Sequence, residues 1–300
     1  MNLRRSIGTL CAEPVIEKYP PRIRGARSSV SVPRWYVVLG TAVLCLITPR
    51  SISAQTSPPP PISDNSFLVE EAYNQEGGIV QHIANFRRAR GGDWLFTFSQ
   101  EWPLGGQLDQ LSYTLPLQSA SGSGAALGDA AINYRRQILG RDDDPVWFSP
   151  RLSLVLPTGN TRRGTGAGGA GLQLNLPLSV RVSRALVTHW NVGASTTRAR
   201  SVLGQRGDVR SVSAGASAIW LAAPTLNLML ETVWDRTEAL DDAGLRGAED
   251  HFVILPGLRG AINLPRDLQI VPGIGVPIGV GPSHGERDVF LYLSFEHPFR

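Results

Sequence analysis

A glycine-rich segment has the spacing of a phosphate-binding loop. Gly164, Gly166 and Gly169 match the pattern G-x-G-x-x-G. This pattern binds a dinucleotide only where a strand precedes it and a helix follows, because the pyrophosphate then meets a helix N-terminus. Here residues 170–182 follow, and they have the most regular strand pattern of the chain. We therefore expect a surface loop rather than a nucleotide site.

Histidines and one acidic cluster are further candidates for metal binding or catalysis. A metal site needs three or four converging ligands, whereas the histidines form no i,i+4 pair and have no Cys partner; they are His82, His189, His251, His284 and His297. Serines near His189 keep a Ser–His hydrolase open as an alternative, although no G-x-S-x-G motif occurs. Asp142-Asp143-Asp144 could bind a cation or form a solvated turn. We expect no catalytic residue, no metal and no cofactor.

The elements that carry the other polar side chains have a period of two. Between Leu172 and Val182 every even position is aliphatic, while the odd positions hold Gln173, Asn175, Pro177, Ser179 and Arg181. Successive side chains of a strand point to opposite faces, so one face is apolar and the other polar. Similar alternation recurs along the chain, for example at Trp94, Phe96 and Phe98. The pattern predicts an all-β protein.

About twelve such segments are expected, near residues 77–86, 93–102, 107–117, 128–138, 146–157, 170–182, 185–196, 209–221, 225–235, 250–262, 267–278 and 287–299. Each has about 10 residues, the length that a tilted strand needs to cross a membrane. The first connection and every second one after it are expected to be long, and most of the others short. Such alternation is typical of outer-membrane barrels with both termini in the periplasm. We predict a transmembrane antiparallel β-barrel of about 12 strands.

Charged side chains within these segments are expected to line the lumen. The strand alternation points six of them inward, namely Glu101, Arg135, Arg151, Arg181, Glu231 and Asp235. An arginine on the lipid face would cost about 2–4 kcal/mol at the bilayer midplane, which favours the lumen. One interpretation is a polarised pore with a basic wall facing an acidic wall. The other is a network of ion pairs that fills a narrow barrel.

Aromatic residues are expected to form two girdles at the membrane interfaces, because their amphipathic rings favour the headgroup level. Trp94, Trp234 and Phe252 fall at outer strand ends. The periplasmic ends hold Trp102, Trp147, Phe148 and Trp220. Trp190 lies near mid-strand and fits neither girdle. The last strand ends at Phe299, close to the C-terminal aromatic residue usual in such barrels, although Arg300 follows it.

The N-terminal region contains the features of an export signal in their usual order. A basic stretch, a short apolar run at 35–47 and small residues up to Ala54 predict a cleaved signal peptide at residues 1–54, with an uncleaved anchor as the alternative. This region carries a net charge of +6 against +4 for the whole chain, so the remainder sums to −2. Nucleic-acid binding thus has no support in the mature chain. Residues 55–76 are expected to form a Pro-rich linker and a segment that is periplasmic or plugs the lumen as a short helix, and residues 77–300 the barrel.

Several strand and turn fragments resemble a known family. They are the segment from Asp64 to Glu76 leading into Gly78-Ile79-Val80-Gln81-His82, the segment Ser149–Leu154, and Leu156-Pro157-Thr158-Gly159-Asn160. Together they resemble the outer-membrane proteins of the MetA-pathway phenol-degradation group. The resemblance implies a barrel that moves small aromatic or hydrophobic compounds, and it supplies no catalytic residues.

These observations predict a channel in the outer membrane that conducts small molecules passively, hydrophobic or aromatic compounds among them. The lumen would be gated by the N-terminal segment or by loops. The expected partners are outer-membrane lipid, lipopolysaccharide, the barrel-assembly machinery and a small-molecule permeant. A sealed structural or surface-interaction barrel is the main alternative, and an outer-membrane hydrolase is a further one.

Overall fold

A computed structural model describes residues 65–119, 124–141, 144–200, 206–240, 245–265 and 268–298. The predicted signal peptide, the proline run of the linker, Asp142, Asp143 and Phe299 lie outside these residues. Among the described residues no helix is long and apolar enough to cross a membrane.

The described chain consists almost entirely of strands. They are β1 (Ile79–Ala89), β2 (Trp94–Pro103), β3 (Asp109–Ser119), β4 (Ala126–Leu127), β5 (Ala130–Arg136), β6 (Val146–Phe148), β7 (Arg151–Leu156), β8 (Gly171–Ser183), β9 (Leu186–Arg200), β10 (Arg206–Ala223), β11 (Leu226–Leu240), β12 (Arg246–Gly260), β13 (Ile262–Leu264), β14 (Leu268–Gly275), β15 (Ile278–Gly279) and β16 (Asp288–Pro298). Two short 3₁₀ turns join them, η1 (Thr161–Arg163) and η2 (Gly281–Ser283).

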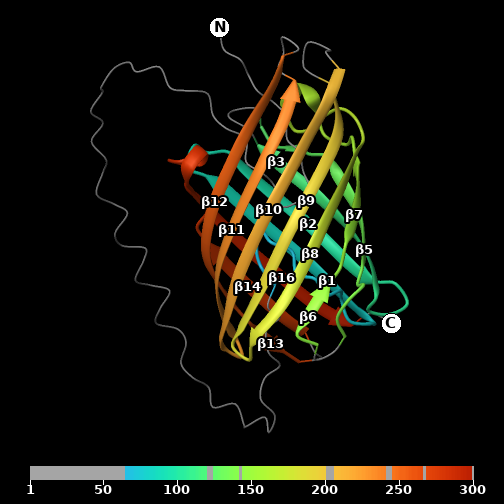
Figure 1. Cartoon of the computed structure of the whole chain (residues 1–300), viewed down its shortest axis with the longest axis vertical. Coiled ribbons are helices and arrows are strands. Elements are labelled where there is room, and N and C mark those ends of the chain that lie inside the picture. The colour runs from blue at the N-terminus through green and yellow to red at the C-terminus, as the bar shows by residue number, and fades with distance from the viewer. Residues whose placement is uncertain are drawn as a thin grey trace, which may run out of the picture.

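Twelve of these strands form a closed antiparallel ring, as the sequence predicts. The order is β1, β2, β3, β5, β7, β8, β9, β10, β11, β12, β14 and β16, and β16 returns to β1. The seam between first and last strand is continuous from Ile79↔Pro298 to Ala89↔Asp288. The shorter strands β4, β6, β13 and β15 add to this ring. Figure 1 shows the resulting barrel of tilted strands.

Proline interrupts two of the predicted strands. The segment predicted at 146–157 is divided into β6 and β7 by Ser149 and Pro150, and Pro277 lies between β14 and β15. Proline has no N–H to donate to a strand ladder, which weakens the ladder at these positions, although β8 continues through Pro177. The strand count is unaffected, because both halves remain in the same wall of the barrel.

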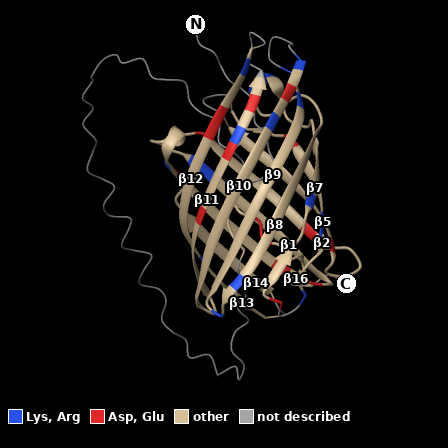
Figure 2. Cartoon of the chain, in the orientation of Figure 1, with Lys and Arg blue, Asp and Glu red and all other residues tan. Residues whose placement is uncertain are grey.

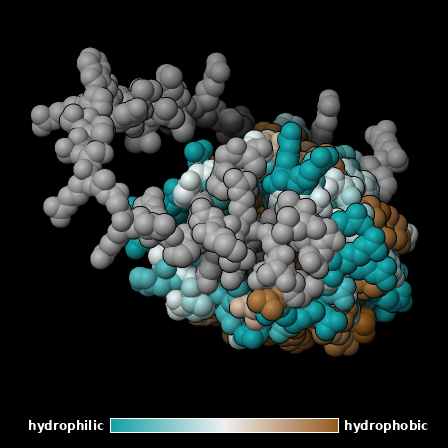
Figure 3. All heavy atoms as spheres, turned by 90° about the horizontal axis from the view of Figure 1, so that it is seen from above, coloured by the Kyte–Doolittle hydropathy of each residue, from teal (hydrophilic) through white to brown (hydrophobic). Residues whose placement is uncertain are grey.

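The barrel has its apolar face outside and its polar face inside. In β8, Leu172 and Leu174 are 52% and 44% exposed, whereas Gln173 and Asn175 are 4% and 1% exposed. An apolar exterior over a polar interior is the arrangement of barrels that are surrounded by lipid. In Figure 2 charged residues gather near the upper ends of β9–β12 and leave most of the outer wall below them uncharged. Figure 3 shows hydrophilic residues on the upper end face and hydrophobic ones at its edge.

The two ends of the barrel differ in their connections. We call the end where β1 begins and β16 ends the terminal mouth, and the opposite end the loop mouth. β8 and β9 are joined at the terminal mouth by two residues, whereas the connection from β7 to β8 at the loop mouth contains η1. The first loop-mouth connection was expected to be long, which is wrong. It is a four-residue turn closed by Ala89 N–H to Asp93 O at 2.8 Å, with Gly92 at φ 104°.

Most of the predicted girdle residues occupy outward-facing strand positions. Six do so, namely Trp94, Trp102, Phe148, Trp220, Trp234 and Phe252. Trp147 is a correction to the expected girdle: it is 4% exposed and pairs with Ser179, whose side chain is fully buried inside the barrel. Phe148 takes the outward position because the alternation places only one of two neighbouring residues on each face.

The outward position of Leu174 gives a test of this inside-out arrangement. Leu174→Arg should lower the free energy of unfolding in phospholipid bilayers by about 2–4 kcal/mol, the cost of an arginine near the bilayer midplane. Leu174→Ala is the control, since it removes the same apolar side chain without adding charge. Chemical unfolding followed by tryptophan fluorescence measures the difference. Equal stabilities of the two variants would contradict a lipid-facing position.

Candidate functional site

The lumen contains a segment of the protein's own chain. We call residues 65–75, which precede β1, the plug segment. A turn closed by Ile79 N–H to Glu76 O at 3.1 Å, with Gly78 at φ 83°, lies between this segment and β1. The plug segment contacts side chains from β3, β5, β8, β9, β10 and β11. It contains bends and no helix, so of the two alternatives for this segment, the short helix is wrong as to secondary structure.

Glu231 binds the N-terminal half of the plug segment. Its carboxylate accepts the consecutive backbone N–H groups of Phe67, Leu68 and Val69 at 2.6, 2.7 and 3.0 Å. The Glu231 side chain is fully buried. Buried backbone N–H groups that lack regular secondary structure need such side-chain acceptors. A hydrogen bond to a charged group contributes about 1.5–3 kcal/mol, so this one side chain is a large part of the plug's attachment.

Phe67 packs into a recess that glycines create in the barrel wall. Its ring centroid lies 5.1 Å from that of Phe290 and 5.5 Å from that of Tyr292. A Cβ atom on Gly257 would lie 2.5 Å from Phe67 Cε2, and one on Gly273 would lie 2.7 Å from Phe67 Cε1. The absence of side chains at these two positions therefore makes the room that the ring occupies.

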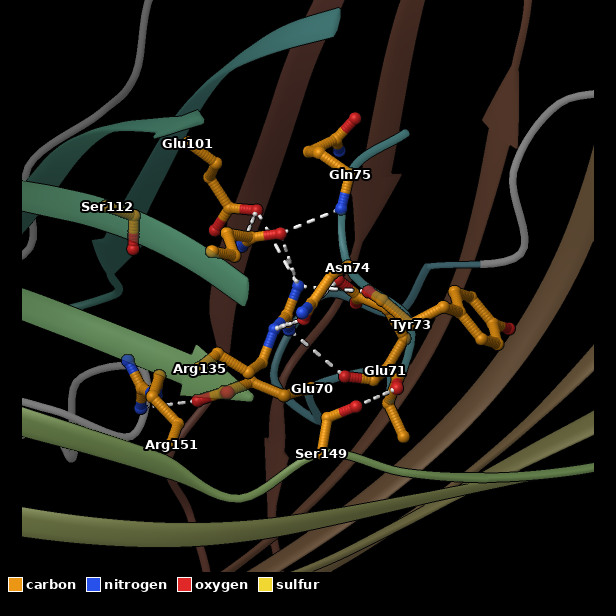
Figure 4. A network of polar contacts seen from close by, with 12 residues as sticks. Glu70, Glu71, Tyr73, Asn74, Gln75, Glu101, Ser112, Arg135, Ser149 and Arg151 are labelled. Atoms are coloured by element: carbon orange, nitrogen blue, oxygen red, sulfur yellow. Dashed lines mark hydrogen bonds and ion pairs between the residues drawn. The ribbon is translucent and has the colours of Figure 1, made fainter. Parts of the chain in front are cut away.

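Arg135 binds the C-terminal half of the plug segment (Figure 4). Its guanidinium donates to Asn74 Oδ1 at 2.9 Å and to the carbonyl oxygens of Glu71 and Tyr73 at 3.1 and 3.0 Å. Carboxylate oxygens of Glu71 and Glu101 lie 3.6 and 3.8 Å from its terminal nitrogens. The planar fork of arginine suits such a set of fixed acceptors. Arg135 thus joins the plug to the wall at β5.

Other wall side chains complete the attachment. Asn191 accepts the N–H of Glu70 and donates to its carbonyl, both at 2.8 Å. Ser179 accepts the N–H of Ala72 at 2.7 Å, and Gln110 accepts that of Gln75 at 2.8 Å. The plug backbone is therefore hydrogen-bonded to the wall from Phe67 to Gln75.

Two further direct side-chain contacts join the plug segment to the wall. Arg151 forms an ion pair with Glu70 on the plug segment. Tyr73 contacts the ring of Trp147 edge-on, with ring centroids 5.3 Å apart. Trp147 is thus part of the interior next to the plug, which explains its burial.

A cavity remains between the plug segment and one side of the wall. Its empty volume is about 960 Å³, part of it open to solvent. The wall side is formed by β1, β2, β3, β5 and β7, with hydroxyl and amide side chains at Asn85, Thr97, Ser99, Ser112, Thr114 and Asn133. The plug side is formed by residues 65–71. The lumen is therefore narrowed by the plug and retains beside it a space with both polar and apolar lining.

The predicted lumen residues are distributed unevenly around this space. Glu101, Arg135 and Arg151 line the cavity, and Glu231 lies beneath the plug backbone. Asp235 is buried inside the barrel, 3.4 Å from His251 Nδ1. Arg181 differs, because it is exposed near the terminal mouth with its guanidinium carbon 5.0 Å from the Trp147 ring centroid.

Sequence reasoning missed the plug's own site residues and the glycines. Glu70, Glu71 and Asn74 precede the first strand, so no strand alternation applies to them. Gln110 and Asn191 occupy inward positions that the alternation does identify, but they carry no charge and were not singled out. Gly257 and Gly273 cannot be recognised from the sequence as recess residues, because the ring that they accommodate belongs to Phe67, far away in the chain.

The glycine-rich loop is a surface loop, as expected, because η1 and then β8 follow β7 without a helix. The loop is attached to Asp129, which accepts the N–H groups of Gly159 and Ala167 at 2.8 and 2.7 Å. Burial raises the pKa of the Asp129 carboxyl above its ordinary value, and these two hydrogen bonds oppose that effect. Asp129 also borders the cavity near the loop mouth.

The structure brings one serine and histidine together. Ser179 Oγ lies 2.7 Å from His189 Nδ1, yet both side chains are fully buried and the serine oxygen accepts the Ala72 N–H. In this conformation no substrate reaches that oxygen, so the pair attaches the plug. Among the residues described, no group of three or more His, Cys, Asp or Glu side chains could hold a metal ion.

Comparison with solved structures relates the barrel by fold to an outer-membrane channel. The COG4313 outer membrane channel from Pseudomonas putida F1 aligns with a TM-score of 0.55 and 13% identity, over 76% of this chain and 98% of that one. The NanC porin aligns with a TM-score of 0.49 and 9% identity, over 72% and 98%. The CymD monoaromatic hydrocarbon channel aligns with a TM-score of 0.42 and 10% identity, over 75% and 90%. No protein-family model and no curated protein matches the sequence.

The glycine recess allows a test of the plug's position. In Gly257→Ala the new methyl group would overlap the Phe67 ring, so backbone amides of residues 67–69 should exchange their hydrogens faster than in the parent protein. Gly247→Ala is the matched control on the same strand, since its Cβ would meet nothing within 4 Å. Hydrogen exchange read by mass spectrometry measures both. Equal protection in the two variants would show that Phe67 does not lie in this recess.

Proposed function

We propose that the protein is an outer-membrane channel through which small molecules diffuse, closed in this conformation by the plug segment. No covalent step is part of the mechanism. A solute enters the cavity from one mouth and passes the barrel when the plug segment moves away from the wall. Outer-membrane lipid and lipopolysaccharide would surround the apolar exterior, and the barrel-assembly machinery would insert it.

The proposal rests on how the plug is attached, namely by hydrogen bonds between its backbone and polar side chains of the wall. Its backbone is bound by side chains of the wall, at Glu231, Asn191, Ser179, Arg135 and Gln110. Water can replace such hydrogen bonds in an aqueous lumen, so the net contribution of each neutral one is only about 0.5–1.5 kcal/mol. A plug attached in this way can leave without unfolding the barrel, whose own strand ladders do not depend on it.

The lining of the cavity suits solutes that have both polar and apolar groups. Hydroxyl and amide groups line the wall side together with Ile83, Pro116 and Tyr292. Two considerations favour aromatic compounds as well: the resemblance to the phenol-degradation group, and the aromatic recess of Phe67, Phe290 and Tyr292, which would accept a ring when Phe67 leaves. Phenols combine both properties, since they carry a ring and a hydroxyl group.

A sealed structural or surface-interaction barrel is the second candidate. The extent of the plug's attachment, from Phe67 to Gln75, favours it. In that case the plug would be a permanent core of the barrel, and no variant that keeps the barrel folded would conduct.

Glu231→Gln separates these two functions. The amide has one acceptor oxygen and no charge, so it cannot replace the carboxylate that accepts three N–H groups. Losing one charge-assisted hydrogen bond of about 1.5 kcal/mol should raise the open population about tenfold. We expect single-channel steps in planar bilayers to become correspondingly more frequent.

Glu238→Gln is the matched control, because Glu238 lies on the same strand, is about 41% exposed and contacts only the exposed Arg246 in the described ion pairs. It should conduct like the parent protein. Barrel integrity is checked by the shift between unheated and heated samples on gels. A folded but silent Glu231→Gln variant would overturn the channel in favour of a sealed barrel.

A further inference from the structure

We propose that Arg135 and Arg151 form a binding site for small organic anions that carry carboxylates, and that Glu70 and Glu71 of the plug segment occupy this site in the closed channel. The inference rests on the proposed channel function, since the ligand would be a solute that enters the lumen. An anion that binds the two arginines would compete with the plug and favour the open state.

Two arginines of neighbouring strands lie side by side on the inner face of the wall. Arg135 on β5 and Arg151 on β7 are direct cross-strand partners. Like charges in that relation repel one another, which destabilises the strand pair unless an anion lies between or beside them. Both guanidinium groups point into the barrel, where their side chains are only 5% and 13% exposed. This pair therefore requires counter-charge inside the lumen.

The plug segment supplies that counter-charge with two consecutive glutamates. Glu70 forms the ion pair with Arg151, and a Glu71 oxygen lies 3.6 Å from Arg135 Nη1. The wall adds Glu101, whose nearest oxygen lies 3.8 Å from Arg135. Figure 4 shows both plug carboxylates directed at the two arginines. The plug thus places two carboxylates on a pair of wall arginines, as a bound dicarboxylate would.

The site is next to free space rather than enclosed in packed chain. Both arginines and both glutamates border the cavity beside the plug segment. Further hydrogen-bonding groups there belong to Ser112 and Asn133, and Arg151 Nη1 donates to Asn133 Oδ1 at 3.3 Å. A solute in the cavity can therefore reach the arginines before the plug has left.

Glu70 is an imperfect ligand for this site. Its Oε2 atom is buried and has no hydrogen-bond partner among the described residues. A buried carboxylate oxygen without a partner loses its hydration without compensation. A free carboxylate can turn so that both oxygens accept from an arginine fork, which is the stronger arrangement. A mobile anion can thus bind Arg151 better than the tethered Glu70 does.

The test is the response of the purified, membrane-reconstituted protein to sodium succinate, a small dicarboxylate. Succinate should raise the open probability in planar bilayers, whereas glycerol at the same concentration should not. In Arg151→Gln the succinate concentration for half the effect should rise about tenfold or more, because one charge-assisted contact is lost. Arg136→Gln is the matched control: Arg136 is next to Arg135, 57% exposed on the outside and paired with Asp109.

A second variant tests the site without changing an arginine. Glu70→Gln combined with Glu71→Gln removes two negative charges beside the cavity. A unit charge at about 7 Å in water changes the local energy by about one kT, so the chloride-to-potassium permeability ratio should rise about threefold or more. Glu76→Gln is the control, since Glu76 is exposed just outside the plug segment. The half-effective succinate concentration should also fall in the double variant and stay unchanged in the control.

The outcomes separate the two proposals. If Glu231→Gln and all the other folded variants remain silent, the channel function fails and the anion site fails with it. If Glu231→Gln conducts, but succinate acts equally on Arg151→Gln and Arg136→Gln, the channel stands and the anion site is overturned. The same holds if the double glutamate variant keeps the permeability ratio of Glu76→Gln.

Discussion

An extended segment inside a barrel must find partners for its backbone, and this constraint shapes the whole interior. Strands pair only with their neighbours in the wall, so the plug's N–H and C=O groups depend on side chains or water. The polar residues on the inner face supply these partners at several levels of the barrel. Glu231 illustrates this constraint, because one carboxylate accepts three consecutive N–H groups. Conversely, the outer face is left to apolar residues that need no hydrogen bond in lipid.

Polar and apolar contacts have different effects on the plug. Water can replace the neutral hydrogen bonds to its backbone, so each of these contributes little, whereas those to the charged Glu231 contribute more. Phe67 behaves differently, since burying its ring contributes about 1.5–3 kcal/mol that water cannot replace. The recess at Gly257 and Gly273 holds that ring. Packing therefore fixes the position of the segment along the barrel. At that position Glu70 and Glu71 lie against Arg151 and Arg135, so the plug neutralises positive charge of the lumen wall.

Strand alternation predicted the barrel well and its contents poorly. Period two is a local property, so residues such as Leu172 to Val182 reveal which face is apolar and twelve strands can be counted. The alternation also identified Glu231 and Arg135 as inward. It could not give their partners, because residues 65–75 have no period and their contacts are more than 60 residues away in sequence for Arg135 and more than 160 for Glu231. Trp147 was misplaced for a related reason: near Pro150 the strand is interrupted, and composition alone does not tell which of two neighbouring aromatic rings faces the lipid.

A reversible tether between the plug segment and the wall shows whether this segment closes a conducting barrel. Ser66 Oγ and Ser217 Oγ are 2.5 Å apart, so cysteines at both positions can form a disulfide. Both native cysteines, Cys11 and Cys45, lie within the predicted signal peptide and would not compete. We would place Ser66→Cys and Ser217→Cys in the Glu231→Gln variant and record bilayer currents before and after reduction. If the plug segment closes the channel, no current flows while the tether is oxidised, and conducting steps appear once it is reduced. Equal conductance in both states, with the disulfide verified on gels, would show that the segment does not close it.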